Sequence, residues 1–394
     1  MSFLAWFFIV YGVLALTHIL FQMLIGHLEH RRQKHKYFKG YHDRHHEKVS
    51  VVVPVYNEDP AILNEAIKSI YEQDHADLEI LVVDDGSQNY KELNEKVYKN
   101  YNHGRAKTLV SKKNIGKRHA QRMAFDKAKG DIIVTVDSDT ILRSKKTISR
   151  IVKRFRDPEV GAVTGDVRVE NAKQNLLTRL ISYRYWTAFH QERAAQSYFS
   201  VLMCCSGPFS AYRKTIIDDV KDRYNSQTFL GQLCTFGDDR HLTNLILEEG
   251  HQVVFDNKAV VYTYVPTTLP QYLKQQVRWN KSFYREMLWT LKSINKHSAY
   301  LIYDLLMQLI LPFLLIVALI ATIIQAFLFG PAILIQYTAI LIGIAFIRAL
   351  YGLYRTKDVG FLLFIVYGFV HVLLLIPTRM YALLTIAKVK WGTR

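Results

Sequence analysis

Residues 48–60 read KVSVVVPVYNEDP and combine a buried strand with the start of a helix. The β-branched apolar run over 49–55 is typical of a strand that is buried on both faces of a parallel sheet. Asp59 and Pro60 are an N-cap and a first helical residue, and apolar residues then recur at helical spacing as far as Ile70. The stretch therefore predicts a strand followed by a helix, the first unit of an α/β sheet.

The same alternation continues along the chain. Two further strands are expected at 78–83 (LEILVV) and 132–136 (IIVTV), with a helix between them near 114–129. This order predicts a doubly wound, mostly parallel sheet with right-handed crossovers, which binds ligands at the carboxyl ends of its strands. All three strands end in polar or acidic residues, namely PVYNE (54–58), DDGS (84–87) and DSD (137–139).

The first apolar segment of this 394-residue chain predicts a membrane helix. Residues 3–26 can cross a hydrocarbon core of about 30 Å and lack a small-residue cleavage site, so we expect a retained helix over 1–27. A basic linker is expected at 28–47, since seven Lys or Arg oppose three acids between His27 and Lys48. By the positive-inside rule the following domain, 48–265, is expected in the cytoplasm. The whole chain is expected to be a multi-pass protein of the plasma membrane.

The C-terminal part of the chain, 299–390, is expected to return to the membrane. Two spans are clear, at roughly 300–328 and 332–353, separated by Gly330-Pro331. The last stretch, 360–386, is long for one crossing and short for two, so both a crossing and a re-entrant or interfacial hairpin stay open.

Two stretches before these spans mix aromatic with basic residues. Residues 171–200 and 266–298 fit helices at the membrane interface, and they fit ordinary amphipathic helices of the domain equally well.

The net charge of +17 favours an anionic partner, such as a nucleoside diphosphate, an acidic polymer or an anionic lipid surface. A nucleic-acid partner is not expected, because the sequence contains no nucleic-acid-binding motif and does contain membrane segments. The three cysteines, Cys204, Cys205 and Cys234, have no metal-binding spacing and are expected to be reduced thiols.

Acidic clusters indicate the chemistry. Sugar transfer from a nucleotide expels a diphosphate, whose charge a hard divalent cation held by carboxylates can neutralise; Asp137 and Asp139 are candidate ligands. Displacement at the anomeric carbon also needs a base for the acceptor hydroxyl, and a carboxylate of the acidic cluster GDDR (237–240) could serve. Each cluster alone also fits a tight turn or a capped helix start. The amide, guanidinium and indole of Gln275, Arg278 and Trp279 suit a diphosphate and a sugar ring.

Five short motifs occur in a fixed order: PVYNE, VDDGS, DSD, GDD and QxxRW. The set resembles the processive family-2 glycosyltransferases, which include cellulose, chitin and hyaluronan synthases. Longer stretches are similar to the bacterial hyaluronan synthases, and the resemblance covers most of residues 48–394. These stretches are NIGKRHAQ (114–121), ERAAQS (192–197), CSGPFSAYR (205–213), GDDRHLTN (237–244), QQVRWNKSFYRE (275–286) and WGTR (391–394).

The resemblance implies a GT-A domain that uses Mg²⁺ or Mn²⁺ and polymerises UDP-N-acetylglucosamine (UDP-GlcNAc) and UDP-glucuronate (UDP-GlcA) with inversion. It implies Asp239 as general base, Asp137 and Asp139 at the metal, and residues 391–394 as a gating motif. The implied donor-binding residues are Tyr56, Glu58, Asp85, Lys117, Arg118, Asp137, Gln275, Arg278, Trp279, Trp391 and Arg394. The implied acceptor-binding residues are Cys205, Ser206, Gly207 and Trp279.

Three other functions compete with this one. A chitin-oligosaccharide or poly-N-acetylglucosamine synthase would share the five motifs and use UDP-GlcNAc only. A transferase acting on a polyprenyl phosphate is disfavoured by QxxRW and WGTR. A non-catalytic export partner is disfavoured because all the candidate aspartates are present.

Overall fold

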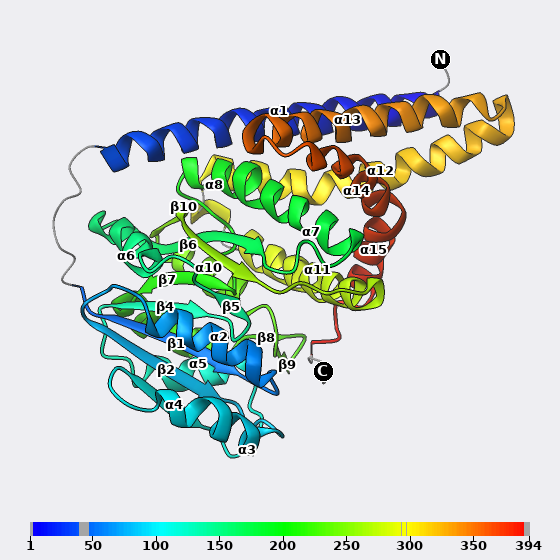
Figure 1. Cartoon of the computed structure of the whole chain (residues 1–394). Helices are drawn as coiled ribbons and strands as arrows, with labels where there is room; N and C mark the ends of the chain where they lie inside the picture. The colour runs from blue at the N-terminus through cyan, green and yellow to red at the C-terminus, as the bar shows by residue number, and fades with distance from the viewer. Residues whose placement is uncertain (1–2, 39–46, 293, 297, 390–394) are drawn as a thin grey trace.

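A computed structural model describes residues 3–38, 47–292, 294–296 and 298–389 of the chain. Its centre is an eight-stranded sheet in the order β3-β2-β1-β4-β7-β6-β10-β5 (Figure 1). A separate two-stranded hairpin consists of β8 (Thr228–Phe229) and β9 (Gln232–Leu233). The strands of the main sheet are β1 (Val49–Val55), β2 (Leu78–Asp84), β3 (Ala106–Val110), β4 (Ile132–Val136), β5 (Thr140–Ile141), β6 (Val160–Val169), β7 (Phe209–Arg213) and β10 (Gln252–Thr263).

Strand β1 lies between β2 and β4 and runs parallel to both, with Val53 opposite Val82 and Val51 opposite Val134. The pairs β2–β3 and β6–β10 are also parallel, whereas β4–β7, β6–β7 and β5–β10 are antiparallel. The sheet is mixed and mostly parallel, which confirms the predicted fold class. Because β1, β2 and β4 are parallel, their carboxyl ends bring PVYNE, DDGS and DSD to one edge.

Helix α2 (Pro60–Tyr71) begins as its sequence predicts. The Asp59 carboxylate accepts hydrogen bonds from the backbone N–H groups of Ala61 and Ile62, two donors that have no partner inside the helix. The apolar face of α2 is buried in the main core. The other helices of the domain are α3 (Tyr90–Leu93), α4 (Lys99–Tyr101), α5 (Lys117–Phe125), α6 (Thr147–Val152), α7 (Leu176–Thr187), α8 (Ala194–Tyr198), α9 (Lys214–Asn225), α10 (Asp238–Glu248) and α11 (Leu269–Lys292).

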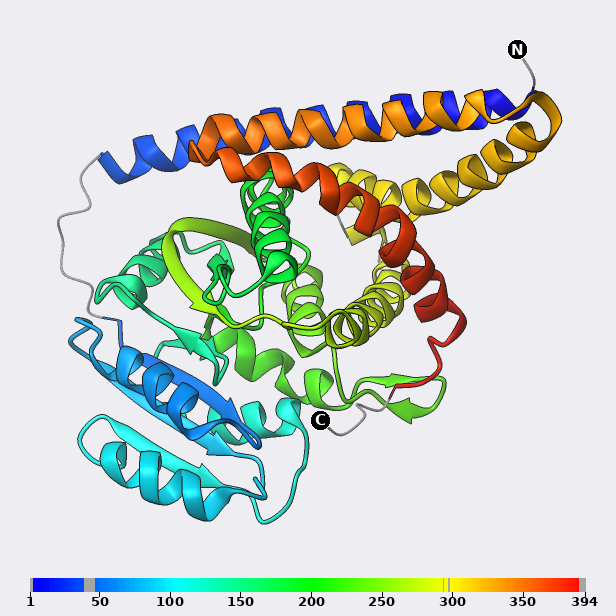
Figure 2. The same cartoon turned by 45° about the vertical axis from the view of Figure 1, so that its right-hand side comes forward.

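Three long apolar helices lie beside this domain: α1 (Phe3–Phe38), α12 (Ala299–Phe329) and α13 (Ala332–Thr356). Helices α1 and α13 lie side by side, and α12 and α13 form a hairpin that turns near the N-terminal end of α1 (Figure 2). One core cluster joins all three helices through Phe8, Ala318 and Tyr337. These helices and the run Val359–Leu384 are long and apolar enough to cross a membrane.

Helix α1 continues well beyond the predicted membrane span. The prediction of a linker was wrong for residues 28–38, which remain helical, and residues 39–46 lie outside the described residues. No Pro or Gly interrupts this part of α1, and its polar side chains bind the α/β domain. Ser197 Oγ donates to Glu29 Oε1 (2.9 Å), and Gln33 Nε2 donates to the carbonyl of Phe255 (2.8 Å). The membrane helix is therefore attached directly to the domain.

The last apolar stretch is one bent helical run and not a hairpin. It consists of η5 (Val359–Leu363), α14 (Phe364–Val370), the π-helical turn η6 (His371–Leu375) and α15 (Ile376–Leu384). The π-helical turn and Pro377 at the start of α15 mark a bend. Near the start of the run, Tyr183 of α7 donates to Asp358 (3.1 Å), and at its end α15 packs on α11. Both ends of the run therefore lie against helices of the α/β domain.

Candidate active site

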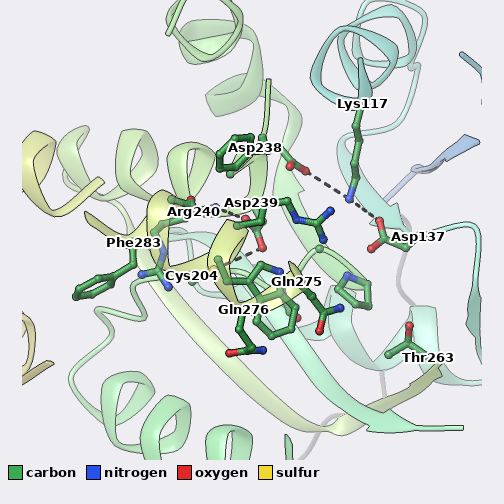
Figure 3. A pocket seen from close by; sticks show the side chains of 18 of the residues that line it. Lys117, Asp137, Cys204, Asp238, Asp239, Arg240, Thr263, Gln275, Gln276 and Phe283 are labelled. Carbon is green, nitrogen blue, oxygen red and sulfur yellow. Dashed lines mark hydrogen bonds and ion pairs between the residues drawn. The ribbon is translucent and has the colours of Figure 1, made fainter. Parts of the chain in front are cut away.

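A large cavity of about 840 Å³ lies between the carboxyl ends of the parallel strands and α11 (Figure 3). Its lining begins with Tyr56 and Asp85, which follow β1 and β2, and extends to Tyr367 and Arg379 on the run Val359–Leu384. The volume is in the range of sites that enclose drug-sized ligands. The cavity thus connects the ligand-binding edge of the sheet with the membrane-associated helices.

Asp85 holds the loop that leads into α5. Its carboxylate oxygens accept hydrogen bonds from the backbone N–H groups of Ile115 (2.8 Å) and Gly116 (2.9 Å). Gly86 has a φ of +71°, and a Cβ on it would lie 2.5 Å from the backbone of Lys113, so this turn requires glycine. Burial raises the pKa of Asp85, and the two backbone donors oppose that shift. The DDGS turn thereby places Asp85 and the first turn of α5 in the cavity wall.

Lys117, the first residue of α5, joins two acidic clusters. Its Nζ lies 2.6 Å from Asp137 Oδ1 and 3.4 Å from Asp238 Oδ2. Burial lowers the pKa of Lys117, but the charges of Asp137 and Asp238 outweigh burial and raise it above its ordinary value. The ammonium group therefore stays charged and supplies a positive site for a diphosphate.

The carboxylates of Asp137 and Asp139 are the kind of ligand that Mg²⁺ and Mn²⁺ prefer. Thr263 Oγ1 donates to Asp139 Oδ1 (3.2 Å), an outer hydrogen bond of the type that orients metal-binding carboxylates. Within the described ranges, no group of three or more His, Cys, Asp or Glu side chains is arranged to hold an ion. Phosphate oxygens of a bound substrate would have to complete the coordination, as Mg²⁺ sites in phosphoryl-binding enzymes commonly require.

Gly207 marks the point at which the candidate groups converge. A Cβ placed on Gly207 would lie 3.4 Å from both Asp137 Oδ2 and Lys117 Nζ, and 3.8 Å from Asp239 Oδ2. Asp137 and Asp239 are far apart in the sequence, yet both face this small volume of the cavity. A ligand bound there would meet the ammonium group of Lys117 and the carboxylates of Asp137 and Asp239.

Asp239 lies in the first turn of α10, which begins after Gly237 at a φ of +85°. Its Oδ1 accepts a hydrogen bond from the backbone N–H of Arg240 (2.8 Å), and the Cys204 thiol donates to its Oδ2 (3.6 Å). Burial and then the charge of Asp238 raise the pKa of Asp239, while Lys117 and Arg240 oppose the shift. A raised pKa strengthens the affinity for a proton, which suits a general base.

Helix α11 supplies Gln275, Gln276, Arg278 and Trp279 to the cavity wall. The Oε1 atom of Gln275 is buried and has no hydrogen-bond partner within the part of the chain that the structure describes. A donor group on a ligand would satisfy it. Trp279 is 42% exposed, so its indole can support a sugar ring.

Three predicted site residues do not reach the cavity wall. Glu58 accepts a hydrogen bond from Ser138 Oγ (2.7 Å), and Cys205 is buried with its backbone N–H bonded to Thr243 Oγ1 (2.8 Å). Arg118 donates instead to the carbonyl of Tyr224 (3.1 Å) and to Gln227 Oε1 (2.9 Å). Successive residues of a helix point about 100° apart, and the side chain of Arg118 points toward Tyr224 and Gln227 while Lys117 faces the cavity. The side chains of these three residues therefore do not form part of the cavity wall.

Ser206 and Gly207 do line the cavity, whereas Trp391 and Arg394 lie outside the described residues. The structure also adds cavity residues that the sequence analysis missed. Arg184 forms a bidentate pair with Glu192 (2.9 and 3.0 Å). Further examples are Cys204, Arg193, Tyr272, Tyr367 and Arg379. The stretch ERAAQS (192–197) and the pair Cys204-Cys205 contain some of these residues. Local sequence does not reveal which residue of such a stretch points into the cavity. All three cysteines are free, as predicted.

Comparison with known proteins agrees with this geometry. The family model described as glycosyl transferase family 2 matches residues 50–221. A hyaluronan synthase of Streptococcus pyogenes serotype M3 (strain ATCC BAA-595 / MGAS315) is 37% identical over 395 residues, covering 98% of this chain and 90% of the relative. This chain belongs to the hyaluronan synthase-like family-2 glycosyltransferases. It is therefore a membrane enzyme that transfers sugar from a nucleotide donor.

One further relative and one solved structure of similar fold have names that state other activities. An N-acetylglucosaminyltransferase of Neorhizobium galegae is 38% identical over 348 residues, covering 88% of this chain and 80% of the relative. A solved structure, the mannosyltransferase PcManGT from Pyrobaculum calidifontis in complex with GDP-Man and Mn²⁺, has a TM-score of 0.58 and 22% identity. The similarity covers 92% of this chain and 99% of that chain, and it shows the shared GT-A fold.

Proposed function

We propose that this glycosyltransferase joins GlcNAc and GlcA units from their UDP donors alternately into hyaluronan and moves the growing polymer across the plasma membrane. The observation that carries the proposal is the convergence of Asp137, Lys117 and Asp239 around Gly207 in a cavity that extends to Tyr367 and Arg379. The net charge of +17 supports an acidic polymer as product. A polymer made on the cytoplasmic face needs a sheltered path, since polar groups in hydrocarbon are costly.

The reaction proposed is a single displacement at the anomeric carbon. The acceptor hydroxyl gives its proton to Asp239, its oxygen bonds to the anomeric carbon, and the bond from that carbon to the diphosphate breaks, which inverts the configuration. Asp137 and Asp139 would hold Mg²⁺ or Mn²⁺, which neutralises charge on the leaving diphosphate. Lys117 adds a positive charge beside Asp137.

The remaining roles divide along the cavity. We assign the nucleotide to Tyr56 and Asp85, since both line the end at which β1 and β2 stop. Ser206 and Gly207 would contact the acceptor near Asp239. Gln275, Arg278 and Trp279 would bind the acceptor and the diphosphate, and residues 391–394 would close over the nucleotide.

The two-donor assay tests the product. Purified enzyme supplied with UDP-GlcNAc, UDP-GlcA and Mg²⁺ is expected to form a polymer that hyaluronidase degrades. Either donor alone is expected to give no long product, because alternation requires both. A hyaluronidase-resistant polymer, or a polymer made from one donor alone, would contradict hyaluronan synthesis.

The relative from Neorhizobium galegae supports a second candidate, a chitin-oligosaccharide or poly-N-acetylglucosamine synthase. Such an enzyme would incorporate GlcNAc from UDP-GlcNAc without any UDP-GlcA. The single-donor arm of the same assay therefore separates the two candidates.

The pKa of Asp239 predicts the acidic limb of the pH profile. A base must be deprotonated, and burial together with Asp238 raises the pKa of this carboxyl. Turnover is therefore expected to fall, as pH decreases, through a pKa above the ordinary aspartate value of about 3.9. Replacing Asp238 with Asn removes the repelling charge and should move this limb to lower pH. The measurement is kcat/KM against pH at saturating metal; a limb that does not move in Asp238→Asn would assign it to another group.

A further inference from the structure

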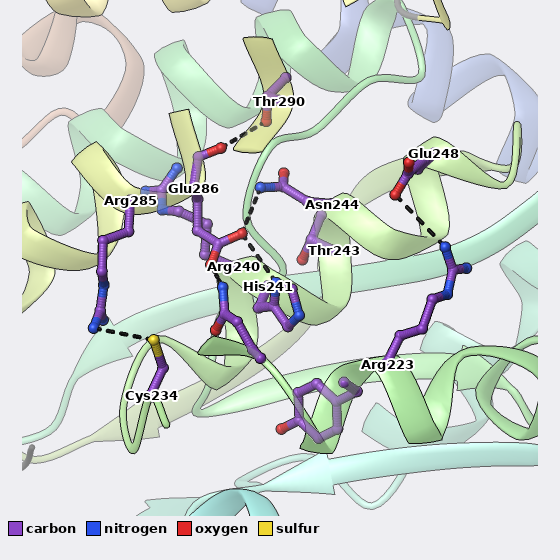
Figure 4. Close-up of polar contacts among 12 residues, drawn as sticks. Arg223, Cys234, Arg240, His241, Thr243, Asn244, Glu248, Arg285, Glu286 and Thr290 are labelled. Atoms are coloured by element: carbon purple, nitrogen blue, oxygen red, sulfur yellow. Dashed lines mark hydrogen bonds and ion pairs between the residues drawn. The ribbon is translucent and has the colours of Figure 1, made fainter. Parts of the chain in front are cut away.

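A buried carboxylate on α11 lies behind the candidate base and outside the cavity wall. Glu286 is 3% exposed and accepts hydrogen bonds from His241 Nδ1 (3.1 Å), from Asn244 Nδ2 (3.0 Å) and from the amide nitrogen of Gln227 (Figure 4). Burial raises the pKa of Glu286, but His241 and the hydrogen-bond donors outweigh burial and lower it, so the group is ionised. An ionised carboxylate is an acceptor only, and three donors match it.

The donors belong to the segments that carry Asp239. His241 and Asn244 lie on α10, whose first turn contains Asp239. The ring of His241 also packs edge to face against Trp289 of α11, with 5.2 Å between the ring centroids. Gln227 precedes β8, and its Oε1 accepts a hydrogen bond from Arg118 (2.9 Å). Glu286 therefore joins α10 and the β8–β9 segment to α11.

Neighbouring residues of α11 support the turn before Asp239. Arg285 Nη2 donates to the carbonyl of Phe236 (3.1 Å), and Arg285 Nη1 donates to Cys234 Sγ (3.5 Å). A Cβ placed on Gly237 would collide with Ser282 Oγ, so the backbone of the GDD turn lies directly on α11. The same helix presents Trp279 and Gln275, about two and three turns before Glu286, to the cavity.

We propose that Glu286 is a positioning residue for sugar transfer, which fixes the Asp239 carboxylate relative to the Gln275–Trp279 face of α11. The proposal rests on the proposed role of Asp239 as base. A helix is stiff along its axis. Helix α11 carries Gln275 and Trp279 and also binds α10 through Glu286, so it sets the distance between those two side chains and Asp239. Reaction rates are sensitive to such placement, since a shift of about 1 Å can cost about 100-fold.

The test is a pair of variants that exchange an amide and a carboxylate. Glu286→Gln keeps the size but turns a donor toward His241 and Asn244, and kcat is expected to fall about 100-fold. UDP affinity is expected to change less than about twofold, because Lys117 and Asp137 lie on other elements. The double variant Glu286→Gln/Asn244→Asp restores a matched pair with the same net charge and is expected to recover most of the lost kcat. Asn244→Asp alone places two carboxylates together and is expected to be impaired.

Asp256→Asn is the matched control for a loss of stability. Asp256 is also a fully buried carboxylate, paired with Arg154 Nε at 2.7 Å, and it does not line the cavity. The Asp256→Asn variant is expected to have a lower unfolding temperature than the wild type, while its kcat per folded molecule stays at the wild-type level. All variants are compared as full-length protein in lipid nanodiscs by UDP release, with folded enzyme quantified by UDP titration.

Three results would overturn the positioning role: wild-type kcat in Glu286→Gln, equal losses of kcat in Glu286→Gln and Asp256→Asn, or no recovery in the double variant. Asp239→Asn, assayed in parallel, separates this inference from the proposed function. If Asp239→Asn stays active, the proposed base falls and the positioning role falls with it. If Asp239→Asn is inactive and Glu286→Gln is fully active, only the positioning role falls.

Discussion

Replacing Asp239 with Asn is expected to lower the rate of sugar transfer about 1,000-fold, which corresponds to about 4 kcal/mol of transition-state stabilisation. The amide has nearly the same shape and can still accept the hydrogen bond from the backbone N–H of Arg240, but it cannot take the acceptor proton. The measurement is kcat for UDP release and polymer formation. Affinity for UDP is expected to stay within about twofold, because Asp85, Lys117 and Asp137 are unchanged.

Asp222→Asn provides the control for this substitution. The Asp222 side chain is 86% exposed and pairs with Arg122 at the surface, so its loss should leave turnover at the wild-type level. The loss of a general base usually costs more than about a tenfold decrease in rate. If Asp239→Asn kept more than about a tenth of wild-type kcat, a group other than Asp239 would have to accept the proton of the acceptor hydroxyl.

Removing the metal, or one of its proposed ligands, is expected to have the second large effect. Chelation should abolish turnover, and Asp139→Asn should lower it about 100-fold or more, because a cation that neutralises a leaving diphosphate contributes several kcal/mol. Asp139 is the better target than Asp137, since Asp137 also holds Lys117 at 2.6 Å. Activity is measured against the concentration of Mg²⁺ and of Mn²⁺.

Recovery on adding either ion back to the chelated wild type is the control for irreversible damage. Asp139→Asn is expected to need more metal for half-maximal turnover than the wild type. Full turnover in the presence of excess chelator would rule out the proposed role of Asp137 and Asp139.

The strands and their terminal motifs were predictable from the sequence because their patterns are local. The run over 132–136 formed a strand with the predicted bounds, and Asp59 capped α2 as expected. Parallel pairing then brings PVYNE, DDGS and DSD to one edge, whatever the details of packing. The helix bounds were less exact, since the helix expected near 114–129 occupies only Lys117–Phe125.

Predictions that depended on side-chain direction or on distant partners were less successful. Arg118 follows Lys117 directly, yet it binds Tyr224 and Gln227 and not the cavity. The predicted linker after residue 27 begins as a helix, because Glu29 and Gln33 find partners on the domain. Cys204 was overlooked beside Cys205, although Cys204 is the thiol that meets Asp239.

The sequence by itself determined the family, the order of strands and helices and the residue types needed for the chemistry. Motifs and hydrophobic periodicity are local properties of consecutive residues, so they can be read without the fold. Only the tertiary structure decided which carboxylates share one volume around Gly207 and which, like Glu286, stand behind them. Those relations depend on contacts between residues far apart in the chain, such as Lys117 with Asp137 and Asp238, and sequence spacing does not specify such contacts.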